Sequence, residues 1–502
     1  MAVSLIEVTQ GDATVTFGFQ PTLVLTWSSA QTANGTSTGA RMMFGAMDAA
    51  GTHRCAFGGN NDGTNGTAAG YRNALFFIHD VAANNTGPAL DGILALATAT
   101  LTGTGLTLDW STANDGTARK YFALGISSTE VTTSRLFSRQ YPTSAQWWSH
   151  AENWDYTPDA LIHFGAYDST IAGDEQSTTS VHHMKLAAVD WRLQQFLALN
   201  RGYGSGAKYA QWGHALGAIN TSTTVSQLGY IRDLYRGGMI AEMTAASLSQ
   251  QFFSGYVLVK MASGYDLQIG TFNSTTGGTT QDVSVNGTPK AVVVCGVNAT
   301  SFTSGTATNA DCRMSIGGSD GTNQGAVWSG KTTTSDPADS YHYNTHSIIH
   351  ATEGTPTLNN QASMAFAAGK FSLTWTGTPA SALQWFHIAI CQRTDLTSGY
   401  GFVRILEPNT SDPRSIYYAV TGVTPTRGDE FEWDDNSGHA IDQFGMITGP
   451  VGSFSARYRP ADAAWTSAAT ITLGSGSSAG HSGPIHGHIS SPIRSAVRGI
   501  IH

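Results

Sequence analysis

The sequence has few charged residues and no long apolar run. Lys, Arg, Asp and Glu make up 12% of the 502 residues, about half of the ~25% that is usual in soluble domains. The formal charge is −9, from 26 basic and 35 acidic residues, so we expect no basic face and no nucleic-acid partner. The longest apolar runs, such as residues 291–295, are far shorter than the ~18 residues of a membrane helix, so we predict no membrane span.

Sequence motifs of familiar chemistry are also missing. No Gly-rich phosphate loop precedes a helix, and HExxH and zinc-type Cys/His spacings do not occur. Four widely spaced cysteines (Cys55, Cys295, Cys312 and Cys391) form no CxxC pair, so each is interpreted as a small buried residue. The N-terminus lacks the basic and apolar segments of a secretory signal, which predicts synthesis in the cytoplasm. We therefore predict no catalytic residues and no bound cofactor.

Glycine and neutral polar residues take the place of charge. The chain contains 57 glycines, and apolar residues make up 40% of it, which is enough for a sizeable core. A neutral, Gly-rich surface can pack flat against copies of the same chain. We therefore expect a homo-oligomer, with a trimer as the first candidate.

Three landmarks recur in the same order along the chain. A proline followed by an apolar strand occurs at residues 21–25, 158–162 and 289–293. An octet with Met second and Asp last occurs at residues 41–48, 183–190 and 313–320. An aromatic residue that opens a strand occurs at residues 121–126, 256–261 and 385–390. The spacings all lie between 129 and 142 residues, which indicates one unit present three times.

This period divides the chain into four predicted domains. We expect β-sandwich repeats over residues 1–130, 131–263 and 264–396, the second being the most divergent. Residues 397–502 lack the octet and are interpreted as a C-terminal β domain that ends in a flexible Gly/Ser-rich tail.

The predicted fold class is all-β. Residues 14–17 and 282–285 alternate polar and apolar with period two, and clusters of Gly, Asn, Thr and Asp separate the strands. Residues 185–200 are ambiguous, because their apolar residues have helical spacing whereas the octet match predicts a strand; we favour the strand. The repeated octet Asp is expected to accept hydrogen bonds from the backbone of its own turn, and no partner for it recurs in the sequence.

The repeats resemble a domain of tailed-bacteriophage virion proteins. The matching positions are Val283, Val285, Pro289, Gly317, residues 320–323, Phe371, Leu373 and Trp375, with residues 121–125 from the first unit. The strand pattern also loosely resembles that of H-type lectins, which are small β-sandwiches that trimerise and bind sugars. Both resemblances imply a fold and a setting, and neither assigns a site residue.

The densest acidic run, residues 429–435, is the strongest candidate for catalysis. On a strand, Glu430, Glu432 and Asp434 would share one face, and paired carboxylates beside aromatics are what a glycosidase needs. The simpler interpretation, which we favour, is a solvated strand face or turn. A calcium loop at residues 434–436 is a weaker alternative, because the spacing of an EF-hand is absent.

His486 and His488 are the one feature that resembles a metal site. Residues i and i+2 of a strand point the same way, so a three-fold axis passing here would gather six imidazoles around a transition metal. The alternative is an exposed tail with two incidental histidines.

The leading hypothesis is a non-enzymatic structural component of a phage virion, most simply a tail, baseplate or fibre protein. A head fibre or capsid decoration protein is the first alternative. The second is a lectin-like module that binds host surface glycans through exposed aromatics such as Trp147, Trp148 and Trp154. The third is a tail-borne polysaccharide depolymerase. The predicted partners are copies of the chain and other virion proteins.

Overall fold

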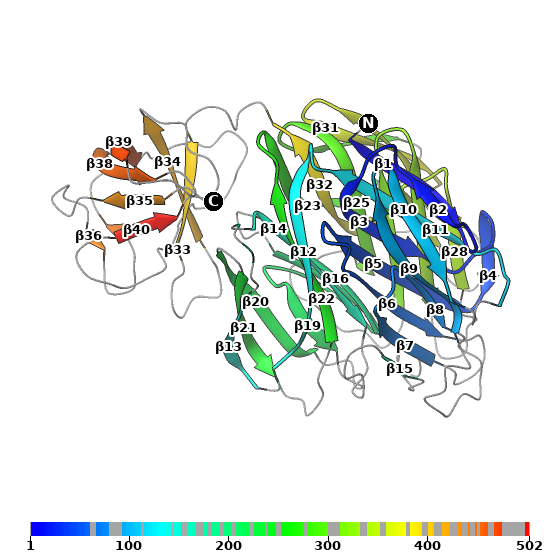
Figure 1. The fold of residues 1–502 in the computed structure, drawn as a ribbon. Coiled ribbons are helices and arrows are strands. Elements are labelled where there is room, and N and C mark those ends of the chain that lie inside the picture. Colours follow the sequence, from blue (N-terminus) through cyan, green and yellow to red (C-terminus); the bar gives the residue numbers. More distant parts are fainter. Residues whose placement is uncertain are drawn as a thin grey trace.

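The fold was analysed in a computed structural model that describes residues 2–393 with gaps, the longest at 80–92 and 300–311. From residue 400 onward it describes only the strands of a C-terminal sheet. The described residues form 40 β-strands and no helix, which confirms the predicted all-β class (Figure 1).

The strands of the first three quarters of the chain fall into three units. The first unit contains β1 (Val3–Thr9), β2 (Thr14–Thr16), β3 (Pro21–Ser28), β4 (Gly35–Thr38), β5 (Ala40–Asp48), β6 (His53–Asn60), β7 (Thr67–Arg72), β8 (Phe76–His79), β9 (Ile93–Thr102), β10 (Gly105–Trp110) and β11 (Lys120–Ser127). The second contains β12 (Val131–Gln140), β13 (Gln146–Ala151), β14 (Ala160–Ala166), β15 (Glu175–Ser177), β16 (His183–Asp190), β17 (Gln195–Arg201), β18 (Ala207–Trp212), β19 (Leu216–Ile219), β20 (Val225–Tyr235), β21 (Gly238–Ala246) and β22 (Phe253–Met261). The third contains β23 (Tyr265–Asn273), β24 (Thr280–Ser284), β25 (Thr288–Ala299), β26 (Cys312–Ser319), β27 (Gln324–Lys331), β28 (Asp339–Tyr343), β29 (Ile348–Ala351), β30 (Leu358–Ala367), β31 (Lys370–Thr376) and β32 (Gln384–Gln392).

The three units have the same strand order. In the first, a large sheet β1-β11-β3-β5-β6-β7 accompanies a small sheet β2-β10-β9-β8. The second has β12-β22-β14-β16-β17-β18 with β13-β21-β20-β19, and the third has β23-β32-β25-β26-β27-β28 with β24-β31-β30-β29. Buried residues from both sheets of a unit form one apolar cluster, so each unit is a β-sandwich.

The sequence landmarks occupy equivalent strands. The octets lie in β5, β16 and β26, with residue 320 just beyond the last of these, and the strands that follow the prolines are β3, β14 and β25. Met42, Met184 and Met314 are all buried. Residues 185–200 contribute to β16 and β17, so the strand interpretation is confirmed and the helical one is wrong. The helical spacing arises because these strands are apolar on both faces: Leu186 and Phe196 pack at the centre of the molecule, and Val189 and Leu197 pack inside the second sandwich.

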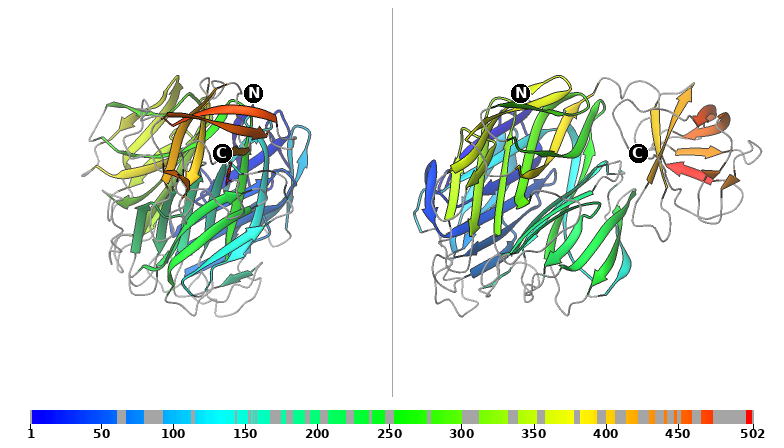
Figure 2. Two further views of the ribbon diagram at one scale, coloured as in Figure 1. Left: turned by 90° about the vertical axis from the view of Figure 1, so that its left-hand side faces the viewer. Right: turned by 180° about the vertical axis from the view of Figure 1, so that it is seen from behind.

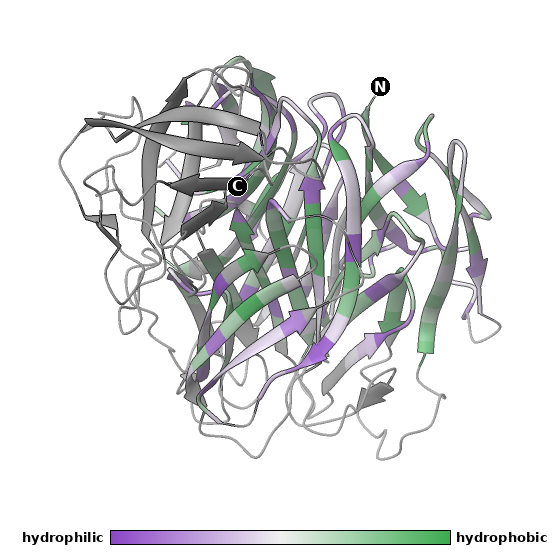
Figure 3. Ribbon diagram, turned by 60° about the vertical axis from the view of Figure 1, so that its left-hand side comes forward, coloured by the Kyte–Doolittle hydropathy of each residue, from purple (hydrophilic) through white to green (hydrophobic). Residues whose placement is uncertain are grey.

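Each large sheet packs against the other large sheets with the face that is turned away from the small sheet of its own unit. One cluster of buried residues takes members from all three sheets, including Trp27, Phe44, Phe164, Phe196, Val293 and Phe386. The rings of Phe44 and Phe164 are 5.4 Å apart between centroids, and those of Phe196 and Phe386 are 4.1 Å apart. Two further views show the three units gathered together (Figure 2), and apolar segments run along their strands (Figure 3). Each large sheet is therefore buried on both faces.

Two strands lie on the sheet of a neighbouring unit. β15 of the second unit pairs with β7 of the first, and β4 of the first unit pairs with β28 of the third. These additions extend two of the large sheets to seven strands.

The C-terminal strands form a separate sheet with the order β33-β34-β39-β38-β35-β40. They are β33 (Tyr400–Ile405), β34 (Arg414–Thr421), β35 (Glu430–Trp433), β38 (Gly452–Arg459), β39 (Thr466–Leu473) and β40 (Val497–Ile500), with β36 (Ala440–Ile441) and β37 (Ile447–Thr448) as a further pair. The predicted tail, residues 474–496, lies outside the described residues.

Candidate functional site

The predicted metal and carboxylate sites fall in the C-terminal part of the chain. His486 and His488 lie outside the described residues, and within the described part no group of three His, Cys, Asp or Glu residues could hold a metal ion. Glu430 and Glu432 lie on a strand, β35, as expected. Its register places Arg459 opposite Glu430, and both Arg457 and Arg498 opposite Glu432.

The three candidate tryptophans have different environments. Trp147 is 49% exposed and, with Tyr156, is one of the two exposed large hydrophobic residues of the described chain. Trp148 and Trp154 are partly buried against the core of the second unit. Of these three, only Trp147 therefore combines an exposed ring with a position on a strand, β13.

Trp147 begins a row of stacked side chains on the outer face of the small sheet of the second unit. The register places Trp147 opposite Glu242, and Glu242 opposite Tyr230. The Arg232 guanidinium lies 5.6 Å from the Trp147 ring and 4.5 Å from the Tyr230 ring, and it forms an ion pair with Glu242. The His214 ring continues the row, 4.4 Å from Tyr230. We call these five residues the aromatic row.

The aromatic row presents one accessible ring next to a fixed charge pair. Arg232 and Tyr230 are 5% and 7% exposed, so they are held rigidly, whereas the Trp147 ring and part of the Glu242 carboxylate face solvent. An exposed aromatic face binds the apolar face of a sugar, and a neighbouring carboxylate accepts hydrogen bonds from hydroxyls. Among the described contacts, no second carboxylate faces Glu242.

A second polar group is enclosed in the core of the same unit. His163 donates from Nδ1 to the carbonyl oxygen of Ala215 at 2.9 Å, so its Nε2 accepts the Tyr141 hydroxyl at 3.1 Å. The Lys185 ammonium position lies 3.9 Å from the centroid of the Tyr141 ring. The Tyr256 ring stacks on His163 at 4.5 Å. All four side chains are buried, so the group is closed to a substrate.

Burial controls the protonation of this buried group. It lowers the pKa of Lys185 far below the ordinary value of a lysine, because an ammonium ion loses its hydration there. Burial also lowers the pKa of His163, and the nearby Lys185 lowers it further. The corresponding positions are Thr26 and Met43 in the first unit and Val294 and Ser315 in the third, so the group does not recur. The sequence signal was Lys185 itself, at an octet position that holds Met in the first unit.

The octet aspartates have partners that the sequence did not reveal. Oδ1 of Asp48 accepts the backbone N–H groups of Ala50 and Thr52, and Oδ1 of Asp320 accepts those of residues 322 and 323, which confirms the predicted turn. Oδ2 of Asp48 also accepts the N–H of Leu136 in the second unit at 2.8 Å. Oδ2 of Asp320 accepts the N–H of Leu5 in the first unit at 2.8 Å. The expectation that no partner recurs is therefore wrong, because two octet aspartates bind the first strand of another unit.

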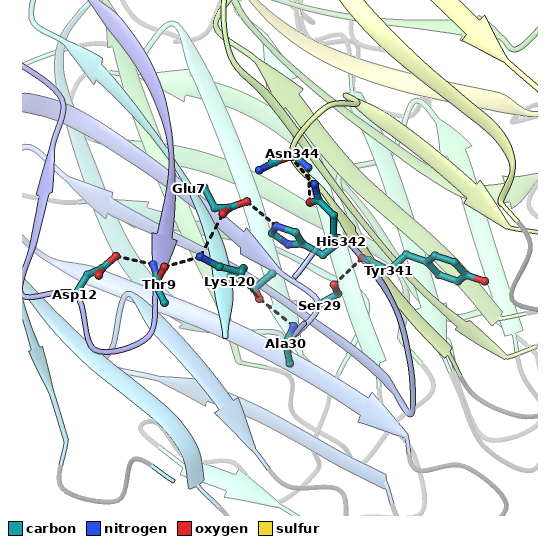
Figure 4. A network of polar contacts seen from close by, with 11 residues as sticks. Glu7, Thr9, Asp12, Ser29, Ala30, Lys120, Tyr341, His342 and Asn344 are labelled. Carbon is teal, nitrogen blue, oxygen red and sulfur yellow. Dashed lines mark hydrogen bonds and ion pairs between the residues drawn. The ribbon is translucent and has the colours of Figure 1, made fainter. Parts of the chain in front are cut away.

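A polar network fills the seam between the first and third units (Figure 4). Nε2 of His342 donates to Glu7 at 3.0 Å, and Lys120 Nζ lies 3.4 Å from the same carboxylate and 2.8 Å from the Thr9 hydroxyl. The hydrogen bond from His342 holds the pKa of Glu7 below its ordinary value. Burial lowers the pKa of His342, whose ring stacks on Phe122 at 4.4 Å. The network joins β1, β11 and β28, so it acts as an inter-unit contact.

Comparison with known proteins leaves the family open. No protein-family model matches this chain, and no curated protein matches it at a significant level. Among the described residues, no helix is both long and apolar enough to cross a membrane. The three cysteines whose surroundings are described, Cys55, Cys295 and Cys391, are buried, as predicted.

Proposed function

We propose that the chain is a non-enzymatic structural component of a tailed-phage virion, made of one β-sandwich unit copied three times and a C-terminal β domain. The observation that carries this proposal is the identical strand order of the three units, together with their shared core. β4 and β15 pair with the sheet of a neighbouring unit, and Asp48 and Asp320 bind the backbone of another unit. Such contacts hold the units rigidly together, as a scaffold requires. The buried group around His163 and Lys185 occurs in a single unit and is closed, which speaks against its being a repeated active site.

Location in the particle is the decisive test of this proposal. A tail, baseplate or fibre position is the first choice, and a head fibre or decoration protein is the alternative. Antibodies against the chain, applied to particles of the phage that encodes it, are expected to label the tail in electron micrographs. Label on the head would favour the alternative, and particles without the chain would overturn the virion assignment. The same particles would reveal whether the chain assembles with copies of itself.

Glycan recognition at the aromatic row is the second candidate function. It rests on Trp147, which keeps an accessible ring on a rigid strand next to Glu242. Trp147→Ala is expected to weaken binding to host-surface polysaccharide about two- to tenfold, because stacking of this kind contributes about 0.5–1.5 kcal/mol. Ser149→Ala, an exposed change two residues along the same strand, is the control. Equal binding by both variants would remove this candidate.

A depolymerase remains the enzymatic alternative, with Glu430 and Glu432 as its carboxylates. The variant Glu430→Gln/Glu432→Gln is expected to leave any polysaccharide cleavage unchanged, because we interpret β35 as a solvated strand face. Loss of a measurable cleavage activity in this variant would reverse the assignment.

A further inference from the structure

Two seams between units are built from equivalent positions of the repeat. The fourth octet residue leads across the large sheet, through the next strand, to Tyr71 of β7 in the first unit and to His342 of β28 in the third. Each of these two strands also holds a strand of another unit, β15 beside β7 and β4 beside β28. Tyr71 and His342 therefore occupy the same place in two seams.

The two side chains bind equivalent residues of another unit. The hydroxyls of Tyr71 and Ser138 of β12 share a hydrogen bond of 2.8 Å, and Nε2 of His342 donates to Glu7 of β1 at 3.0 Å. Ser138 and Glu7 each stand two residues after the leucine whose N–H group binds an octet aspartate. Of these two pairs, only His342 with Glu7 contains a group that titrates near neutral pH.

The His342 ring is fully buried in the seam between the first and third units (Figure 4). It stacks on Phe122 of β11, with 4.4 Å between ring centroids and 4° between the ring planes. Within the described part of the chain, Nδ1 of His342 has no hydrogen-bond partner. The closed seam therefore suits a neutral imidazole that carries its proton on Nε2.

Protonation of His342 is unfavourable while the seam is closed. The second proton must go to Nδ1, because Nε2 already donates to Glu7, and a buried N–H group without an acceptor costs free energy. Glu7 favours the charged ring and Lys120 opposes it, and β4 and β27 bring only the uncharged Gly35 and Val327 to it. Burial is the largest effect, so the pKa of His342 lies below its ordinary value of 6.5.

We propose that His342 makes the seam between the first and third units an acid-sensitive latch, in which protonation of the imidazole loosens the contacts of β28 with β1 and β4. Opening of the seam gives Nδ1 access to water, so the open state binds a proton that the closed state excludes. Opening therefore becomes more favourable as pH falls below 6.5, and the effect ends at the lower pKa of the closed state.

The partner carboxylate acts in a lower pH range. The hydrogen bond from His342 holds the pKa of Glu7 below its ordinary value of 4.5 in the closed seam. The stabilisation that Glu7 provides is therefore complete above pH 4.5 and is lost only as pH falls through its lower, closed-state pKa. The interval between pH 6.5 and pH 4.5 consequently reports on His342.

Hydrogen exchange of the full-length chain tests the latch without any substitution. Protection factors, corrected for the intrinsic exchange rate at each pH, are measured at pH 6.5 and pH 4.5. The amides of β28 and β4 are expected to lose protection by about tenfold, the effect of a pKa difference of about one unit. The amides of β7 and β15, at the equivalent seam with the Tyr71–Ser138 pair, are expected to stay within about twofold of their protection at pH 6.5.

Exchanged pairs test the role of the imidazole directly. Glu7→Ser/His342→Tyr installs the pair of the other seam, and it should abolish the acid effect at β28 and β4. His342→Gln, which keeps a side-chain N–H donor without a titrating ring, should do the same. The reciprocal variant Tyr71→His/Ser138→Glu is expected to make the protection of β7 and β15 sensitive to acid.

Three outcomes would overturn the proposal. The first is unchanged protection of β28 and β4 between the two pH values in the unsubstituted chain. The second is an equal loss at β7 and β15, which would mean a general effect of acid on the sheet edges. The third is an acid effect at β28 that persists in His342→Gln. The first two outcomes need no variant to fold.

Discussion

At the scale of single residues, a few carboxylates and one lysine have effects beyond their own unit or strand. Asp48 is 1% exposed and each of its oxygens accepts backbone N–H groups, one set in its own turn and one in the second unit. Burial raises the pKa of Asp48, although its hydrogen bonds oppose this shift. The octet Asp is therefore both a turn former and an inter-unit contact.

Asp48→Asn tests this double role. One of the two oxygens becomes an NH₂ group that faces backbone donors, so we expect a loss of about 1–3 kcal/mol in the free energy of unfolding. Asp109→Asn, on the exposed side of β10, is the matched control and should change stability by less than about 0.5 kcal/mol. Chemical denaturation measures both. Equal stability of the two variants would mean that the Asp48 contacts contribute nothing.

Lys185 should make stability depend on pH. Its pKa is lowered in the folded protein, so the unfolded chain binds a proton that the folded chain does not. The free energy of unfolding is expected to fall as pH decreases below the ordinary lysine value of 10.5, by up to about 1.4 kcal/mol per pH unit, until the folded pKa is reached.

Lys185→Met, which installs the residue of the first unit, should remove this slope and stabilise the protein at neutral pH. Lys370→Met, at an exposed lysine, controls for the loss of one positive charge. Denaturation series between pH 6 and pH 10 (about the range in which lysine and histidine shifts act) provide the measurement. A slope that survives in Lys185→Met would contradict the assignment.

At the scale of elements, glycines allow strands of different units to approach closely. A Cβ atom built on Gly325 of β27 would lie 2.2 Å from Cε1 of Phe122, whose strand β11 belongs to the first unit. The Phe122 ring cannot retreat freely, because it is buried and stacked on His342. This position therefore determines how closely the first and third units pack.

Gly325→Ala is expected to destabilise the protein by about 1–3 kcal/mol through overpacking. Gly103→Ala is the control, because nothing lies within 4 Å of the Cβ that it would add. Thermal unfolding compares the two. Should Gly325→Ala unfold at the wild-type temperature, the seam would be looser than the contacts indicate.

At the scale of the whole molecule, the three units depend on one another. They share a central apolar cluster, and two of them hold a strand that belongs to a neighbour. Breaking one unit exposes apolar surface on the other two, so local opening of a single unit is costly.

We expect the three units to unfold together on heating. Hydrogen exchange measured across the melting range should show β5, β16 and β26 losing protection at one temperature, within about 2–4 °C. The strands of the C-terminal sheet serve as an internal reference, because they belong to a different sheet. Separate melting of β5, β16 and β26 would contradict a shared core.

The sequence by itself determined the all-β class, the strands at the octets, prolines and aromatics, the strand at residues 185–200 and the buried cysteines. These depend on local alternation, turn residues and the low charge of the chain, which a linear sequence records directly. The virion role, the oligomer and the metal at His486 and His488 stay predictions.

Only the tertiary structure decided that β15 pairs with the first unit and β4 with the third. It also decided that Asp48 and Asp320 bind another unit. The burial of Lys185 and His163 was likewise decided by the tertiary structure. Edge pairing between β4 and β28 joins residues about 300 positions apart through backbone atoms, which every residue carries alike. Such pairing depends on how the sheets pack against one another, and no local pattern of side chains specifies it.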